Sequence, residues 1–392
     1  MKSLPVLLLY GIDEQTLPVD AEVTLHSIER AQQVLRSRGW RVETCQITDD
    51  FESALAPFAP CEWLVFNLCE GSPSQPFYYA RAARELEQRG HVYTGSDWVS
   101  LDQTQFKPEM KRLLEAQNVP TPRWAVVASA PPGIAVRNPR AETDRGCVED
   151  QPQQIAMGKS MVDFRFGSAA AGLRHSRGPR IDLSLDLFPA IVKPAAEHCS
   201  FGVTRESVVF TREEAREQIR LINQNYAGGA MIEEFLDSDE YGVSLWGNGD
   251  ESEVFGVSVI RYNGFPDLRD RLCTFDAKWE PETDAYKKTM PVCPAPLTPG
   301  FRAKLESVAE RAHRACGARD YSRIDIRLKD GKPMVLDVNT NCAVSENSGF
   351  VETARLARGL DYGAVLEKLL VMAARRYEMS EEKQAKSCEA RL

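Results

Sequence analysis

The sequence lacks the local signatures of several common cofactor and metal sites. None of its 10 cysteines forms a C-x-x-C pair, and its five histidines show no zinc-binding spacing. No Gly-x-Gly-x-x-Gly segment follows a strand pattern. Gly158-Lys159-Ser160 resembles the end of a P-loop, but Gln153 stands where the first glycine belongs. A zinc domain, a Rossmann dinucleotide site and a P-loop are therefore excluded, whereas composition alone leaves histidine-assisted nucleophilic catalysis open.

Positive charge and long apolar runs are also scarce. Lys and Arg number 48 against 57 Asp and Glu, giving a net charge of −9, and the pI is about 5.3. No basic field exists to attract nucleic acid or anionic lipid. The apolar run at residues 6–10 follows one lysine and stops at Gly11, too short for a signal peptide or a membrane span. With scattered, reduced cysteines, we expect a cytoplasmic protein that binds neither nucleic acid nor membrane.

The composition is that of a globular protein with two or three domains. The 392 residues are 43% hydrophobic and 27% charged. The first hundred alternate strand patterns at 4–10, 40–47 and 61–68 with helix patterns at 21–38 and 77–89. That order predicts a doubly wound α/β sheet, whose ligands lie beyond the carboxyl ends of the strands.

The remaining chain divides by composition. A helix at about 103–117 precedes two prolines, and residues 128–181 are rich in Pro, Gly, Ala and Arg with little periodicity, which predicts a mobile insertion. Strand and helix patterns then continue to about residue 377. We predict an N-terminal substrate domain at 1–100, a central lobe at 101–236, a C-terminal lobe with a metal site at 237–378 and a flexible tail at 379–392.

The most informative segment is a β-hairpin from Ser322 to Asn341. Two alternating runs flank Lys329-Asp330-Gly331. A three-residue loop with Gly331 at positive φ puts all the alternating apolar side chains on one face. The other face then carries Arg323, Asp325, Asp337 and Asn339, and the apolar face carries Ile324, Ile326, Leu328, Met334, Leu336 and Val338.

Two carboxylates and a carboxamide on one rigid face suit a hard cation. Asp325 and Asp337 are expected on adjacent strands as diagonal neighbours, roughly 5 to 8 Å apart, with Asn339 beside them. Oxygen ligands without His or Cys favour Mg²⁺ over zinc, and Mg²⁺ usually accompanies phosphate. The alternative is an exposed face with a cross-strand ion pair between Arg323 and Asp337.

Two upstream segments are consistent with a nucleotide site. Lys193 ends a short apolar strand and precedes a small-residue loop, where Ser200 and backbone N–H groups near Gly202 can meet an anion. A second strand leads into residues 233–236, whose backbone groups can hold a purine, and Glu240 can accept hydrogen bonds from ribose hydroxyls. Each acidic residue taken alone is more often an ordinary surface residue.

The ordered set of these motifs resembles the ATP-grasp superfamily, in its D-alanine–D-alanine ligase-like branch. The resemblance rests on Leu101-Asp102 with Lys107, Val192-Lys193-Pro194, Glu233-Glu-Phe-Leu236 with Glu240, Ala277-Lys278, Arg323-Ile-Asp325 and Leu336-Asp-Val-Asn339. It implies an ATP-grasp fold, in which an N-terminal doubly wound α/β domain is followed by two α+β lobes that clasp ATP.

The resemblance also implies roles for individual residues. Lys107 and Lys193 contact the ATP phosphates, with Ser200 in the phosphate loop. Lys278 reaches the transferred phosphoryl group, and Arg323 with the backbone N–H of Ala343 stabilises the oxyanion. The adenine contacts are Glu233, Glu234, Phe235 and Leu236, the ribose contact is Glu240, and the ligands of Mg²⁺ or Mn²⁺ are Asp325, Asp337 and Asn339.

The substrate region departs from the family pattern. Trp279 replaces a tyrosine, Ala343 replaces a glycine, and Glu70-Gly71 replaces a His-Gly pair. Glu22, Glu70, Trp279 and Ser348 are the expected substrate contacts. We therefore expect an ADP-forming carboxylate–amine ligase that works through an acyl phosphate on a substrate other than simple D-alanine. The alternatives are a D-alanine–D-alanine ligase of peptidoglycan synthesis and a non-catalytic ATP-binding protein. The expected partners are a small carboxylate, a small amine and a second copy of the chain in a homodimer.

Overall fold

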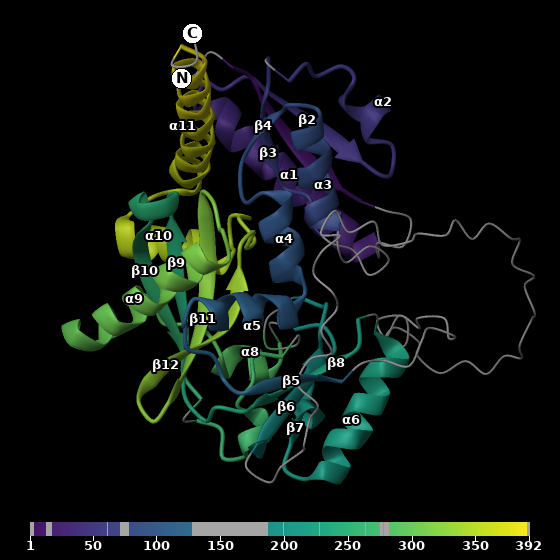
Figure 1. Cartoon of the computed structure of the whole chain (residues 1–392), viewed down its shortest axis with the longest axis vertical. Coiled ribbons are helices and arrows are strands. Elements are labelled where there is room, and N and C mark those ends of the chain that lie inside the picture. Colours follow the sequence, from purple (N-terminus) through teal and green to yellow (C-terminus); the bar gives the residue numbers. More distant parts are fainter. Residues whose placement is uncertain are drawn as a thin grey trace, which may run out of the picture.

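A computed structural model of the chain describes residues 4–12, 18–60, 62–70, 78–127, 187–198, 200–226, 228–262, 264–274, 277 and 282–389. Three four-stranded sheets account for the strands within these ranges (Figure 1). The segment predicted as an insertion, together with Lys278 and Trp279, lies outside the described residues.

The first sheet is parallel, as the alternating pattern predicted. Its order is β2-β1-β3-β4, formed by Val42–Ile47, Val6–Gly11, Leu64–Asn67 and Val92–Tyr93. Alternate residues of β1 enter opposite cores: Val6 and Leu8 pack with helix α1 (Pro18–Ser37), and Leu7 and Leu9 pack with helices α2 (Phe51–Leu55) and α3 (Tyr78–Gln88). Helices therefore cover both faces, which confirms the doubly wound arrangement.

The second sheet is antiparallel and has its own core. Its order is β5-β8-β6-β7, formed by Trp124–Val127, Ala230–Glu234, Ala190–Pro194 and Val208–Val209. Helix α6 (Arg212–Asn225) buries Ala215, Ile219 and Ile222 against it. The sheet and α6 form the lower lobe in Figure 1, with the short 3₁₀ helices η3 (Arg205–Ser207) and η5 (Leu268–Asp270) at its edge.

The predicted helix at 103–117 is two helices. Helix α4 (Trp98–Gln105) ends at Phe106, whose backbone is extended, and α5 (Lys107–Ala116) begins at the next residue. Pro108 lies in the first turn of α5, where its missing N–H costs nothing, but it cannot continue a helix from upstream. The break turns α5 so that Lys107 and Lys111 are both buried.

The third sheet is antiparallel with the order β10-β9-β11-β12. Its strands are Glu253–Ile260, Glu240–Trp246, Tyr321–Lys329 and Lys332–Asn339. Helix α9 (Pro299–Ala315) covers one face, and α10 (Gly349–Arg358) packs on β10. The remaining elements are η4 (Gly249–Glu251), α8 (Asp284–Lys288) and α11 (Tyr362–Glu389), and α11 extends into the segment predicted as a flexible tail.

The turn of the β11–β12 hairpin has two residues, so the predicted three-residue loop was wrong. Lys329 pairs with Lys332, and the turn residues Asp330 and Gly331 have φ values of +50° and +72°. This Asp-Gly geometry matches the twist of a hairpin. The apolar face is nevertheless restored, because a β-bulge at Leu336 shifts the register between Asp325 and Ile326. The buried core residues are Ile324, Ile326, Val335 and Val338, whereas Met334 and Leu336, both predicted on this face, lie outside this core.

The N-terminal domain and the C-terminal lobe share one hydrophobic core. Val6 and Leu8 of β1 belong to the same buried cluster as Trp246, Phe350 and Leu366. Helix α11 lies beside the N-terminal sheet in Figure 1 and contacts α1 and β4. The first and last parts of the chain are therefore packed as one unit. Among the described helices, none is both long and apolar enough to cross a bilayer.

Candidate active site

A single large cavity collects the predicted site residues. It has a volume of about 1500 Å³ and lies among the N-terminal sheet, the central lobe and the C-terminal lobe. All sixteen predicted residues that the structure describes line it: Glu22, Glu70, Lys107, Lys193, Ser200, Glu233, Glu234, Phe235, Leu236, Glu240, Arg323, Asp325, Asp337, Asn339, Ala343 and Ser348. Residues that lie up to 326 positions apart in sequence therefore face one space.

A buried charge cluster forms the floor of this cavity. Glu233 of β8 is 1% exposed, and its two oxygens bind Lys111 at 2.5 Å and Lys193 at 2.6 Å. Lys111 is fully buried and also donates to Thr121 Oγ1 and to the carbonyl of Val335. Burial works against the charge on Glu233, but the two lysines outweigh it and lower its pKa. The cluster thus connects the central sheet to strand β12 and holds Lys193 at the cavity surface.

The carboxylates of the β11–β12 hairpin lie directly opposite each other, not diagonally as predicted. Asp325 pairs in register with Asp337, and Arg323 pairs with Asn339. Arg323 binds Asp325 through two hydrogen bonds of 2.8 and 2.9 Å, and Asn339 donates to the same carboxylate at 3.0 Å. The ion pair of Arg323 is therefore made within its own strand, and the cross-strand pair with Asp337 is not formed.

Asp337 is held ionised by surrounding cations. Burial by itself would raise its pKa, but Lys107, His198, Lys193 and Lys111 together lower it to about 2. The carboxylate of Asp337 and these cationic side chains therefore concentrate opposite charges at one end of the cavity. Within the described residues no cluster of three or more His, Cys, Asp or Glu has metal-binding geometry, so a cation here would rely on Asp325, Asp337, Asn339 and further oxygens from a ligand.

A segment between β8 and β9 forms a second wall. The side chain of Glu234 is engaged by Lys329 at 2.6 Å and by Arg123 at 3.3 Å. Arg327, 4% exposed, donates to the carbonyl of Leu236 at 3.0 Å and to Glu240 at 3.1 Å. The guanidinium carbon of Arg327 also lies 5.2 Å from the centre of the Phe235 ring. These contacts fix the segment from 234 to 236 and leave a narrow apolar wall formed with Ile191 and Leu272.

The other predicted residues occupy defined positions. Lys107 donates to the carbonyl of Glu197, and Ser200, in the left-handed region at φ +63°, donates to the carbonyl of Cys273 at 2.7 Å. Ser348 caps helix α10 by accepting from the N–H of Val351. Ala343 is an exposed residue of the loop between β12 and α10. Lys107, Ser200 and Ser348 are thus each held by a backbone group, and all four residues line the cavity.

Three site residues were missed from the sequence: Lys111, His198 and Arg327. Lys111 lies four positions after Lys107, one helical turn along α5, and this spacing could have identified it. Arg327 continues the alternation of Arg323 and Asp325 along β11, which puts it on the same face. His198 has no comparable pattern.

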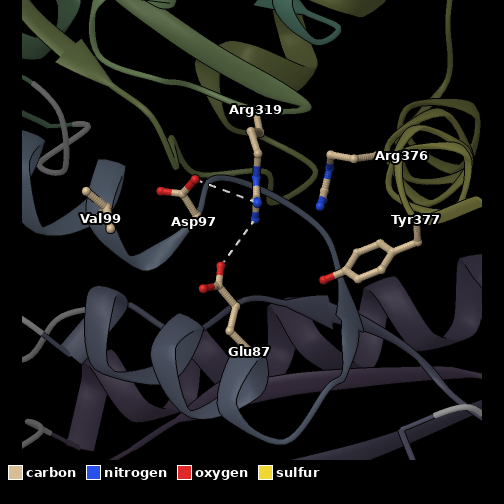
Figure 2. A pocket seen from close by; sticks show the side chains of 6 residues that line it. All are labelled: Glu87, Asp97, Val99, Arg319, Arg376 and Tyr377. Carbon is tan, nitrogen blue, oxygen red and sulfur yellow. Dashed lines mark ion pairs between the residues drawn. The ribbon is translucent and has the colours of Figure 1, made fainter. Parts of the chain in front are cut away.

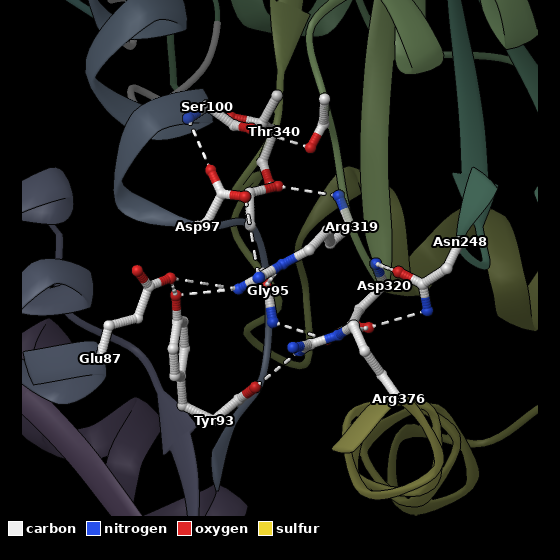
Figure 3. Close-up of polar contacts among 12 residues, drawn as sticks. Glu87, Tyr93, Gly95, Asp97, Ser100, Asn248, Arg319, Asp320, Thr340 and Arg376 are labelled. Carbon is white, nitrogen blue, oxygen red and sulfur yellow. Dashed lines mark hydrogen bonds and ion pairs between the residues drawn. The ribbon is translucent and has the colours of Figure 1, made fainter. Parts of the chain in front are cut away.

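A polar joint connects the hairpin to the N-terminal domain (Figure 3). Asp320, fully buried at φ +60° just before β11, accepts hydrogen bonds from the N–H of Gly95, from Asn248 and from Arg376 of α11. Thr340, just after β12, accepts from Ser96 through its carbonyl and contacts Thr104 through its hydroxyl. The segment after β4 therefore holds both ends of the hairpin that carries Arg323 and Asp325.

Next to this joint lies a smaller pocket of about 410 Å³ (Figure 2). Its Arg319 points between Asp97 and Glu87 at 3.7 and 3.9 Å and donates to the hydroxyl of Tyr93. Arg376 and Tyr377 of α11 form the opposite side. Because its charges are already balanced by one another, we assign this pocket to the joint and not to a ligand.

Comparisons with known proteins agree with this geometry. A family model described as "D-ala D-ala ligase C-terminus" matches residues 180–371. An uncharacterized protein, y4sG, of Sinorhizobium fredii is 27% identical over 82% of this chain and 77% of its own length. A D-alanine–D-alanine ligase of Ralstonia nicotianae is 25% identical over 74% of this chain and 69% of its own.

The fold is matched over nearly the whole chain by a solved structure. D-alanine–D-alanine ligase from Bacillus anthracis, solved in complex with ATP, superposes with a TM-score of 0.64 at 16% sequence identity, covering 96% of this chain and 99% of its own. The family model, the sequence relatives and this structure agree with the motifs and sheets described above. The chain therefore has the ATP-grasp fold of the D-alanine–D-alanine ligase-like proteins, and its residues 180–371 match the C-terminal domain of that family.

Proposed function

We propose that this protein is an ADP-forming carboxylate–amine ligase that joins its substrates through an acyl phosphate. One observation carries the proposal: a single cavity presents a cationic end at Lys107 and Lys193, opposed carboxylates at Asp325 and Asp337, and Arg323 between them and the substrate loops. Cations and a metal clamp are what phosphoryl transfer requires, since charge spreads over the transferred oxygens.

The nucleotide would occupy the space between the two antiparallel sheets. The fixed segment 234–236 and the apolar wall suit a purine, Glu240 suits the ribose, and Lys107 and Lys193 suit the phosphates. Glu233 would support the site indirectly, because its carboxylate is already bound by Lys111 and Lys193. Ser200 would contribute to the phosphate loop. This is the cofactor assignment that the sequence motifs predict, with Glu233 as a positioning group.

The donor set fits Mg²⁺, and Mn²⁺ as a substitute. Asp325, Asp337 and Asn339 supply hard oxygens from two facing strands, and phosphate oxygens would complete the coordination. When bound, the ion would neutralise charge on the phosphates. Arg323 and Asn339 hold the carboxylate of Asp325 in one orientation, so the ligand is positioned before a metal arrives.

The proposed reaction has two balanced steps. A substrate carboxylate oxygen bonds to the γ-phosphorus, the bond to the β-phosphate oxygen breaks, and ADP leaves. The amine nitrogen then bonds to the acyl carbon, inorganic phosphate leaves with the electron pair of the C–O bond, and the nitrogen loses a proton. Arg323 and the N–H of Ala343 would stabilise the tetrahedral oxyanion, and Lys278 would contact the transferred phosphoryl group.

The test is ADP release from the full chain with ATP and Mg²⁺ while carboxylates and amines are varied. Release on substrates other than D-alanine supports the proposal. Release on D-alanine alone would instead identify a D-alanine–D-alanine ligase, which the names of several relatives favour. ATP binding without release on any pair would contradict both and indicate a non-catalytic nucleotide-binding protein.

A substitution on the hairpin tests the metal site. We expect Asp325→Asn to lower Mg²⁺-dependent ADP release at least 100-fold, because a neutral amide neither holds the cation nor orients Arg323. Asp330→Asn in the turn of the same hairpin removes a charge at a position where asparagine also tolerates positive φ, so its activity should be unchanged. Equal activity of the two variants would remove Asp325 from the site.

Two further predictions from the sequence stay predictions. A homodimer would be detected by light scattering of the purified chain, and a monomer at all concentrations would contradict it. Cytoplasmic location would be tested by fractionation of cells that express the full-length gene.

A further inference from the structure

We propose that Arg327 is a positioning residue of the nucleotide site, and that the ribose hydroxyls are recognised only while Arg327 holds the carboxylate of Glu240. The inference rests on the proposed function, which assigns the ribose to Glu240, and it adds the group on which that contact depends. It follows from the contacts of one buried guanidinium, which meets three separate segments of the chain at the wall of the cavity.

The guanidinium of Arg327 uses each of its three nitrogens on a different segment. Nη1 donates to the carbonyl of Leu236 at 3.0 Å, Nη2 to the carbonyl of Arg271 at 2.8 Å, and Nε to Oε2 of Glu240 at 3.1 Å. Because a guanidinium is planar and rigid, it holds these three acceptors at fixed positions relative to one another. A lysine, with one nitrogen on a flexible stem, could not hold all three in this way.

Two aromatic rings fix the orientation of this guanidinium. Its central carbon lies 4.7 Å from the centre of the Tyr262 ring and 5.2 Å from the centre of the Phe235 ring. Both distances are within the range of cation–π contacts. Arg327 is therefore held in place by protein groups alone, and its position does not depend on a bound nucleotide.

Glu240 depends on Arg327 for both its position and its charge balance. Its side chain is 20% exposed and lines the cavity, and its one ion pair within the described residues is with Arg327. Oε2 accepts the hydrogen bond, and no described residue donates to Oε1, which can therefore accept from a ribose hydroxyl. Without Arg327, the carboxylate would move freely and would carry an uncompensated negative charge in the cavity proposed to bind the triphosphate.

The contact with Arg271 connects this arrangement to the central lobe. The loop after β10 carries Arg271 and docks on the central lobe, where Arg269 pairs with Glu214 of α6 at 2.7 Å. Arg327 itself lies on β11 of the C-terminal sheet. Its side chain therefore joins that sheet to the proposed purine segment, the proposed ribose contact and a loop fixed to the other lobe. These contacts set the distance between the purine and ribose contacts.

A nucleotide that lacks the ribose hydroxyls tests the inference. Calorimetry measures the binding of ATP and of 2′,3′-dideoxyATP to the full chain with Mg²⁺, without a carboxylate or an amine. We expect the wild type to bind ATP about 10- to 100-fold more tightly, the range of a hydrogen bond to a charged acceptor. Arg327→Met should reduce this preference to less than about threefold, mainly by weakening ATP binding. A merely structural role would instead weaken both nucleotides equally, and that result would overturn the proposal.

Two further substitutions control this measurement. Arg302→Met removes a paired arginine from α9, which packs against the apolar face of the same sheet, and should keep the preference of the wild type. Arg327→Lys keeps the positive charge but not the three contacts, so its preference should be intermediate. If Arg327→Met does not fold, Arg327→Lys decides, and an unchanged preference in that variant would overturn the proposal.

A double-variant cycle tests whether Arg327 acts through Glu240. Glu240→Gln should also lower ATP affinity about 10- to 100-fold, because it removes the charged acceptor. Combining it with Arg327→Met should lower ATP affinity by no more than about threefold beyond either single variant. Independent losses that multiply in the double variant would overturn the proposal.

Binding and turnover together distinguish this inference from the ligase proposal. If Arg327→Met removes the preference for ATP, but no carboxylate and amine cause ADP release, the inference holds and the ligase proposal fails. If ADP is released, but the wild type binds ATP and dideoxyATP alike or Arg327→Met keeps the preference, the ligase proposal holds and the inference fails.

Discussion

The buried cluster of Glu233, Lys111 and Lys193 gives the sharpest test of how the central and C-terminal lobes are held together. Glu233→Gln removes the only carboxylate that binds both lysines directly. Lys193 is 12% exposed and faces the cavity, where Asp337 and Glu240 still favour its charge. Lys111 is fully buried, and burial already lowers its pKa even with Glu233 present. The cost of the variant therefore falls mainly on Lys111.

The expected loss is about 3 to 5 kcal/mol, the usual cost of breaking a buried ion pair by removing one partner. Lys111→Met should cost a similar amount, since it leaves half of the Glu233 carboxylate without its partner. The double variant should lose little more stability than either single variant, because it leaves neither a buried lysine without its carboxylate nor a carboxylate without its lysine. The coupling energy is then about 2 to 4 kcal/mol, well outside the range for independent sites.

Hydrogen exchange of β8 amides, followed by mass spectrometry, measures this change within the lobe concerned. A loss of about 3 kcal/mol lowers the protection of β8 more than 100-fold. Glu213→Gln on α6, whose side chain is 78% exposed, is the matched control and should change protection little. Additive losses from Glu233→Gln and Lys111→Met, to within about 0.5 kcal/mol, would refute the reasoning.

The same variant has a defined pH dependence. Without Glu233, the pKa of Lys111 in the folded state falls further below its value in the unfolded chain. The unfolded chain then binds more protons, so stability rises with pH. Raising the pH from about 7 to about 10 should therefore recover part of the stability that Glu233→Gln loses. A loss of stability that stays the same over this pH range would contradict the lowered pKa of Lys111 in the variant.

Two other predictions concern buried residues that support the β11–β12 hairpin: Asp320, just before β11, and His313 of α9, whose Nδ1 lies 2.7 Å from Ser322 Oγ of β11. Asp320→Asn should lower the free energy of unfolding in urea by about 3 to 5 kcal/mol, because Arg376 loses its buried partner, and should also lower kcat for ADP release. Asp250→Asn, at an exposed position, is the control. A loss for Asp320→Asn no larger than that of the control would argue against the joint. Burial, helped by nearby Arg314, lowers the pKa of His313 to about 4. In the unfolded chain this histidine takes up a proton near pH 6.5, whereas in the folded protein it stays neutral until the pH nears 4. The fold therefore loses about 3 kcal/mol of stability as the pH falls from about 6.5 toward 4. His313→Gln should flatten that acid limb, and an unchanged limb would show that another group titrates.

Much of the fold was predictable because its signals are local. Alternating residues in β11 and β12 identified the hairpin, and the strand–helix alternation of the first hundred residues identified the parallel sheet. The turn length was missed because a bulge at Leu336 restores the apolar face that the three-residue loop was invoked to explain. Asp330-Gly331, typical of a two-residue turn, was the signal that should have been preferred.

Contacts between site residues that lie far apart in the sequence could not be predicted from local patterns. The bond from Gly95 to Asp320 joins residues 225 positions apart, and neither residue has a pattern that indicates its partner. The two oxygens of Glu233 meet one lysine from α5 and another from β6, so its role as a shared counter-charge exists only in the folded chain. Local sequence therefore identified which residues face the cavity, while the fold decides which of them are already engaged by protein groups.

In the proposed reaction, a substrate carboxylate is phosphorylated before the amide bond forms. The most direct measurement uses a carboxylate substrate labelled with ¹⁸O in both oxygens, incubated with the full chain, ATP, Mg²⁺ and an amine. We predict that one ¹⁸O atom per turnover appears in inorganic phosphate, because one carboxylate oxygen of the substrate leaves with the phosphoryl group. Unlabelled phosphate, with ADP formed at the same rate, would show that ATP is hydrolysed by water and would contradict the account.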